Sequence, residues 1–114
     1  MKYLIIKLSD KRDGRLDPPN IYDDKALRER ACGDWTTSLP TLYKTNHCLV
    51  LYKKLILREY ILSDEITLVR EKNRIRFHIL KEIKDSKYVK RMLDYRSSNP
   101  LSVLDSSQFK YIQN

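Results

Sequence analysis

Apolar residues are densest in two neighbouring runs near the middle of the chain. The runs are His47 to Tyr52 and Leu55 to Leu62, and only Lys53-Lys54 separates them. Two β-prone runs around a two-residue polar break predict a β-hairpin. Lys-Lys lacks the Gly or Asn that a type I′ turn favours, so a longer or bulged loop is an alternative. No other part of the chain is apolar for so long, and we expect the core to surround Val50 and Ile56.

Further segments show the patterns of strands. Arg74 to Ile79 alternates, with Arg74, Arg76 and His78 on one face and apolar residues on the other, which predicts a half-buried strand with a basic outer face. We expect turns at Ser63-Asp64 and at Glu71 to Asn73, where Asn suits a tight turn. The other predicted strands are Lys2 to Leu8, Glu65 to Arg70 and Phe109 to Ile112, and Leu101 to Leu104 is a short apolar segment.

Two segments have the signals of helices. Asp23 or Asp24 can cap a helix that runs to about Cys32, and Gly33 is placed to end it. Asp85 or Ser86 can cap a second helix from Lys87 to about Tyr95, with apolar residues along one side. A short helix near Ser38 and Pro40 is expected in the connector Thr36 to Lys44.

The loop from Ser9 to Asn20 is polar and contains Gly14, one of the two glycines in the chain. Loops of this length in small domains are often functional. The length of 114 residues predicts a single domain, 1–114. Together these elements predict an α+β fold. We expect a small, strongly bent antiparallel sheet or β-barrel of five or six strands, with two main helices packed at its rim.

The charge of the chain limits its partners. It carries 23 Lys and Arg against 15 Asp and Glu, a net charge of +8. Ten cations and four anions fall between Arg70 and Arg96. Such an excess favours an anionic partner, namely nucleic acid, a nucleotide or an acidic protein, although solubility alone can also account for it. We expect no membrane segment and no signal peptide. Two cysteines do not indicate a disulfide scaffold, so we expect a reducing cytoplasm.

A nucleic-acid surface would combine cations on a strand with cations on the helix that follows. Its cations would meet phosphates, while aromatic side chains stack on bases. The alternative is a solvated face with tyrosines in the core, and Trp35 is either a core residue or a stacking platform. The candidate nucleic-acid-binding residues are Arg70, Lys72, Arg74, Arg76, Lys87, Lys90 and Arg91, and the candidate pocket residues are Trp35, Tyr52, Arg58 and Tyr60.

Several motifs occur in an order that resembles a group of small standalone domains of bacteria and phages. Those domains carry a helix ending in Arg-Gly-aromatic-Trp, then a strand pair, and later a helix before Asn-Pro. The corresponding segments here are Ala31 to Trp35, Cys48 to Ile61 and Asn99 to Leu101, with Cys32 in place of the Arg and Asp34 in place of the aromatic residue. The resemblance covers about residues 22–104. It implies a PUA-like β-barrel, a fold class that binds RNA or modified nucleobases, with possible links to phage defence or restriction-modification.

Other chemistry is less well supported by the residues. Glu82-Ile83-Lys84, with Asp34 or Asp64 as a second ligand, could form a Mg²⁺-dependent nuclease site, but this spacing is common by chance. A zinc site or a Cys-His pair would draw on Cys32, His47, Cys48 and His78, and the adjacent His47 and Cys48 would face opposite sides of a strand. We therefore expect no metal, no cofactor and no catalytic residues.

The predicted function is a non-enzymatic module that binds nucleic acid or a nucleobase. The alternative is a phage-type inhibitor that sequesters a nucleotide messenger or covers a host protein. A deep pocket would favour nucleotide capture, and a broad convex basic face would favour a polynucleotide. The sequence leaves the oligomeric state open.

Overall fold

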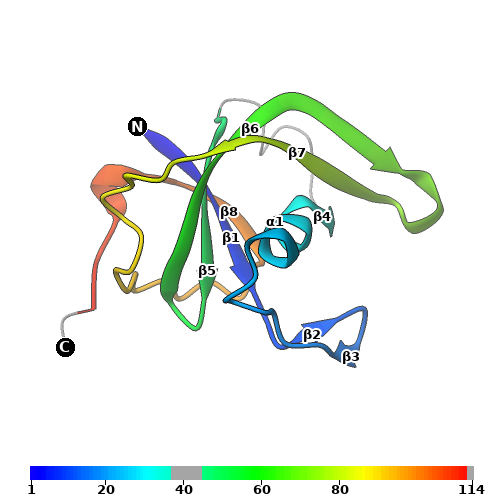
Figure 1. Cartoon of the computed structure of the whole chain (residues 1–114), viewed down its shortest axis with the longest axis horizontal. Helices are drawn as coiled ribbons and strands as arrows, with labels where there is room; N and C mark the ends of the chain where they lie inside the picture. Colours follow the sequence, from blue (N-terminus) through cyan, green and yellow to red (C-terminus); the bar gives the residue numbers. More distant parts are fainter. Residues whose placement is uncertain (37–44, 113–114) are drawn as a thin grey trace.

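A curled six-stranded sheet forms the body of the molecule, with one α-helix inside its curve (Figure 1). The computed structural model describes residues 1–36 and 45–112. The connector with the predicted short helix near Ser38 and Pro40 lies mainly outside them. The described elements are β1 (Lys2–Leu8), β2 (Lys11–Arg12), β3 (Arg15–Leu16), α1 (Asp24–Cys32), β4 (Gly33–Trp35), β5 (His47–Tyr52), β6 (Leu55–Val69), the 3₁₀ turn η1 (Arg70–Lys72), β7 (Arg74–Glu82), β8 (Leu101–Asp105) and the 3₁₀ turn η2 (Ser106–Gln108).

The strand order in the sheet is β4-β7-β6-β5-β1-β8, and β2 and β3 form a separate small hairpin. The strand-rich fold with a bent sheet of six strands is confirmed. All neighbours are antiparallel except β1 and β5, which run parallel. The prediction of a wholly antiparallel sheet is therefore wrong at this pair. The chain between these strands is long enough for the crossover that parallel pairing requires.

The central strands are buried on both faces, which explains their unbroken apolar runs. One face packs around Val50 and Leu27, and the other packs around Leu49 and Ile56. Val50 and Ile56 are both 0% exposed, as predicted. Strands covered on both sides do not alternate in polarity, whereas a strand with one wet face does. The burial pattern of β7 alternates over Arg74 to His78, which confirms its prediction.

The central hairpin has the two-residue turn that its sequence indicates. Lys53 and Lys54 have φ angles of 50° and 70°, so both adopt the positive φ that a type I′ turn requires. The predicted turn at Ser63-Asp64 is wrong, because β6 continues through it to Val69. The register against β7 shifts between Leu62 and Ile66. The polar residues of the predicted turn lie within this register shift, and β6 continues past them. Bulges of this kind increase the local bend of a strand.

The second main helix, predicted for Lys87 to Tyr95, does not form. The backbone of this segment pairs with the start of β6 instead: Ile56 N–H donates to Arg91 C=O (2.9 Å) and Lys90 N–H donates to Ile56 C=O (2.9 Å). Lys90 has a φ of 76°, which is incompatible with a helix. The segment buries Leu93 and Tyr88 against the second face of the sheet. Instead of forming a helix, the segment covers this face of the sheet and pairs with β6.

The C-terminal segment adds little to the sheet. The predicted strand at Phe109 to Ile112 is reduced to one bridge, between Tyr111 and Leu93. The short apolar segment Leu101 to Leu104 lies within β8, which pairs with β1. Among residues 1–36 and 45–112, no helix has both the length and the apolar character needed to cross a membrane.

Candidate functional site

A cavity of about 520 Å³ opens where the end of β1, the β2–β3 hairpin, β4 and the start of β7 meet. This volume falls in the range of small-molecule sites. Basic residues dominate its wall. Two carboxylates and one large aromatic side chain also line it. The cations are Lys7, Lys11, Arg12, Arg30, Lys72 and Arg74, the carboxylates are Asp13 and Asp34, and the aromatic residue is Trp35.

The helix α1 fixes one wall of the cavity. Asp23 accepts a hydrogen bond from Ala26 N–H (3.1 Å) and so caps the helix as predicted. Leu27 and Ala31 are buried in the curve of the sheet. This orientation directs Arg30 toward the preceding loop, where it donates to the Ser9 carbonyl oxygen (2.9 Å). The predicted functional loop is therefore held against the helix.

Gly33 ends the helix, as predicted, and begins β4. Its φ is 147°, in the region that favours glycine. A Cβ at this position would lie 3.0 Å from the carbonyl oxygen of Ile75 in β7. Glycine thus permits the close approach of two backbones, and this brings the next two residues, Asp34 and Trp35, to the cavity wall.

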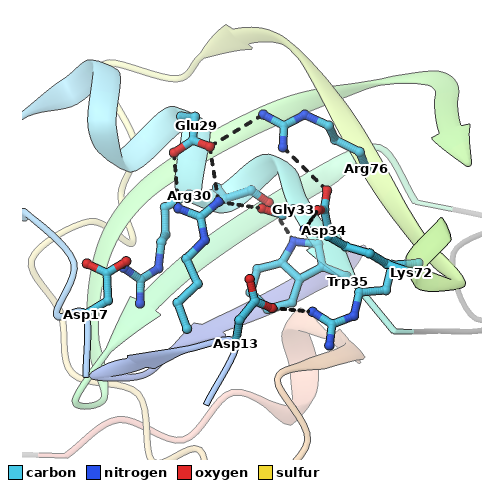
Figure 2. A network of polar contacts seen from close by, with 12 residues as sticks. Asp13, Asp17, Glu29, Arg30, Gly33, Asp34, Trp35, Lys72 and Arg76 are labelled. Atoms are coloured by element: carbon cyan, nitrogen blue, oxygen red, sulfur yellow. Dashed lines mark hydrogen bonds and ion pairs between the residues drawn. The ribbon is translucent and has the colours of Figure 1, made fainter. Parts of the chain in front are cut away.

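Ion pairs connect the elements around the cavity (Figure 2). Glu29 of α1 lies 3.1 Å from Arg12 of β2 and 3.8 Å from Arg76 of β7. Arg76 also lies 3.6 Å from Asp34. The hydrogen bond from Arg12 lowers the pKa of Glu29. The charged side chains therefore hold the hairpin, the helix and β7 in one arrangement.

Trp35 contributes both to the core and to the cavity wall. Its ring packs against the main core cluster, and it also lines the cavity. The indole Nε1–H donates to the Ala31 carbonyl oxygen (2.8 Å), which fixes the ring orientation and uses its only donor. What Trp35 offers the cavity is therefore aromatic surface. Figure 2 shows this hydrogen bond as a dashed line from the indole ring.

The predicted basic residues fall into two groups. Lys72 and Arg74 line the cavity, Arg76 adjoins it through Asp34, and Arg70 is exposed in η1. The segment that carries Lys87, Lys90 and Arg91 lies at the other end of the long axis (Figure 1). There the Arg91 guanidinium lies 3.4 Å from the centre of the Tyr111 ring. Of the predicted basic residues, the structure therefore brings Lys72 and Arg74 to the cavity wall and Arg76 beside it.

Three of the four predicted pocket residues do not line this cavity. Tyr60 is 1% exposed within the core, and burial raises its pKa to about 12. The Tyr52 hydroxyl donates to Asp10. Arg58 pairs with Asp24 and lies 3.9 Å from Glu82. Only Trp35 of this set faces the cavity.

Sequence reasoning missed Lys7, Lys11, Arg12 and Arg30, which supply most of the positive charge of the cavity. Part of the signal was present, because the loop from Ser9 to Asn20 is charged, long and contains a glycine. Gly14, with a φ of 78°, makes the tight turn between β2 and β3. Arg30 gave no such signal, since it lies in an ordinary amphipathic helix.

The residues considered for metal or nucleophilic chemistry lie in separate surroundings. His47 Nδ1 lies 3.7 Å from Glu59, and His78 Nε2 lies 2.7 Å from the Thr67 hydroxyl. Cys48 is buried, which raises its pKa. Within 1–36 and 45–112, no group of three or more His, Cys, Asp or Glu side chains is placed to hold a metal ion.

The residues of the nuclease alternative also have local partners. Glu82 lies 3.3 Å from Lys84. Asp64 accepts a hydrogen bond from Asn46 (2.9 Å), and Asp34 is part of the cavity wall.

Comparisons with known proteins add no family to this geometry: the chain matches no protein-family model, no curated protein and no solved structure. The cavity and its residues are therefore the only indication of function in the described part of the chain.

Proposed function

We propose that this protein is a non-enzymatic binding module for nucleic acid or a nucleotide, and that the cavity beside Trp35 receives one nucleotide unit. The observation that carries the proposal is the composition of the cavity wall: six cations and two carboxylates around one aromatic ring. Cations attract phosphate groups, and an aromatic face stacks on any base. A concave site that has both cations and an aromatic ring suits a nucleotide better than a simple anion.

The curled sheet with one helix in its curve is compatible with the PUA-like barrel that the sequence motifs imply. That fold class is used to bind RNA or modified nucleobases, so it agrees with the chemistry of the cavity wall. A role in phage defence or restriction-modification is part of the same proposal. Fold alone does not establish function, and the proposal depends on the cavity.

Capture of a free nucleotide is the second candidate, as in a phage-type inhibitor that sequesters a nucleotide messenger. The concave shape and the volume of about 520 Å³ favour it. The separation of the two basic groups along the long axis also favours a compact ligand over a broad phosphate-binding face (Figure 1).

Titration with nucleoside monophosphates and with short single-stranded RNA and DNA tests the proposal. Trp35 is the only tryptophan of the chain, so its fluorescence reports on the cavity, and calorimetry gives an independent affinity. Lys11→Ala removes an exposed cation of the cavity wall and should weaken binding several-fold. Lys87 is an exposed lysine at the far end of the molecule, so Lys87→Ala is the matched control and should leave the affinity unchanged.

The outcomes separate the two candidates. Tighter binding of a mononucleotide supports nucleotide capture, and tighter binding of a strand supports a nucleic-acid module. Absence of a fluorescence change and of binding heat with every probe contradicts both.

A further inference from the structure

We propose that the cavity selects guanine among the common nucleobases, and that the carboxylate of Asp34 makes this selection. The inference rests on the proposed function and deepens it, because it names the base.

A bulge in β4 places Asp34 and Trp35 on the same cavity. Gly33 lies opposite Arg76 and Trp35 lies opposite Ile75, so Asp34 is an extra residue without a partner in the register. Successive side chains of a regular strand point to opposite faces, and a bulge redirects one of them. Both residues line the cavity, and the Asp34 carboxylate lies 3.3 Å from Nζ of Lys72 in the same wall. A base stacked on the indole would lie within reach of the neighbouring carboxylate.

The Asp34 carboxylate retains capacity to accept hydrogen bonds. Its Oδ2 lies 3.3 Å from Lys72 Nζ, and its Oδ1 lies 3.6 Å from Arg76. Close charge-assisted hydrogen bonds are about 2.7–2.9 Å long, so both contacts are loose. The side chain is 19% exposed, which partly shields it from water. The two contacts do not occupy all of its lone pairs.

The other groups near Trp35 cannot provide the same recognition. The indole N–H already donates to the Ala31 carbonyl oxygen. Asp13 lies 2.9 Å from Arg74, and its side chain is 54% exposed on the hairpin. Of the two carboxylates in the described cavity wall, Asp34 is therefore the less hydrated and the less closely paired.

An ionised carboxylate is an acceptor with two oxygens, so it favours a base edge with two adjacent donors. Guanine presents N1–H and its exocyclic amino group side by side. Adenine places the acceptor N1 beside its amino group, cytosine places the acceptor N3 there, and uracil has one N–H between two carbonyl oxygens. Only guanine can donate to both oxygens of Asp34 at once.

The phosphate of the same ligand has its own cations. Lys7 and Lys11 line the cavity, and neither makes an ion pair with any residue in the described part of the chain. Lys7 Nζ donates to the Ser97 carbonyl oxygen (3.1 Å), a neutral partner that leaves its charge uncompensated. These two lysines can bind the phosphate, which leaves Asp34 to select the base.

The test compares guanosine, adenosine and inosine 5′-monophosphates by calorimetry and by Trp35 fluorescence. A bidentate pair discriminates bases by roughly tenfold or more, so guanosine monophosphate should bind at least that much more tightly than adenosine monophosphate. Inosine monophosphate has N1–H without the amino group and should fall between them. This comparison uses the unmodified chain and does not depend on the folding of a variant.

Asp34→Asn keeps the shape of the side chain and should remove most of the guanine preference, without loss of adenosine monophosphate affinity. Asp64→Asn, on the exposed part of β6, is the matched control and should keep the preference. Equal affinities for the three nucleotides, or an Asp34→Asn variant that still prefers guanine, would overturn the inference and leave the proposed function intact. Failure of all three nucleotides and of the oligonucleotides to bind would overturn both.

Discussion

The guanidinium of Arg30 donates a hydrogen bond of 2.9 Å to the carbonyl oxygen of Ser9, directly after β1. The Arg30 side chain is only 10% exposed, and it also lies 3.6 Å from Asp17 at the other end of the hairpin loop. A buried arginine is retained where its charge is paired and its donors are used. This contact joins the helix to both ends of the loop that forms one wall of the cavity.

Arg30→Met should destabilise the protein by about 1–3 kcal/mol, because it leaves the partners of a buried guanidinium unpaired. It should also weaken nucleotide binding, since the β2–β3 hairpin loses its attachment to α1. Chemical denaturation and calorimetry measure the two effects. Arg28→Met, at an exposed position of the same helix, is the control and should change stability by less than about 0.5 kcal/mol. Equal stability of the two variants would contradict this role of Arg30.

Gly33→Ala should be more destabilising than Gly14→Ala. Both glycines have positive φ angles, 147° for Gly33 and 78° for Gly14. A Cβ at Gly14 meets no atom within 4 Å, whereas a Cβ at Gly33 lies 3.0 Å from the Ile75 carbonyl oxygen. We expect a loss of about 1 kcal/mol at Gly14 and of about 2 kcal/mol or more at Gly33. Thermal denaturation of the two variants provides the comparison, and a smaller loss at Gly33 would be inconsistent with this close approach.

The pair Arg12–Glu29 should make stability depend on acid pH. The hydrogen bond from Arg12 lowers the folded-state pKa of Glu29 below its ordinary value of 4.5. The stabilisation is therefore fully present above pH 4.5 and is lost as the pH falls through the folded-state pKa. Because the Glu29 side chain is 51% exposed, solvent screening keeps the effect below about 1 kcal/mol. Denaturation between neutral and acid pH should show a shallower decline for Glu29→Gln, and an identical decline would argue against the pair.

The parts of the fold that the sequence predicted depend on local patterns. The central hairpin follows from two apolar runs around Lys53-Lys54, and α1 follows from a capping aspartate and Gly33. The helix predicted for Lys87 to Tyr95 does not form. The apolar spacing of this segment is helical, but its backbone pairs with β6 and its buried side chains pack on the sheet. A local pattern cannot show that a distant strand supplies hydrogen-bond partners.

The candidate site was less predictable for a similar reason. Lys72 and Arg74 stand out in a basic segment, and Trp35 is the only tryptophan. Arg12 and Arg30 reach the same cavity from a hairpin and a helix far away in the sequence. Tyr60 is of a residue type that can stack on bases, but its side chain faces the core. Predicting which cations meet requires the curl of the sheet, and only the three-dimensional fold provides it.

Salt dependence should reveal how many phosphates the protein contacts. For a single strand, each phosphate contact contributes about 0.7 to the slope of log affinity against log salt concentration. Arg74→Ala combined with Arg76→Ala removes two cations at or beside the cavity, so it should weaken binding and reduce the slope by about 1.4 if each cation contacts one phosphate. Affinities for a short single-stranded RNA at several salt concentrations measure this change.

Lys87→Ala combined with Arg91→Ala is the control at the far end. An unchanged slope limits phosphate binding to the cavity, and a reduced slope extends phosphate binding along the molecule. An affinity that does not vary with salt would exclude phosphate binding at either end, because displaced counterions make every such contact sensitive to salt.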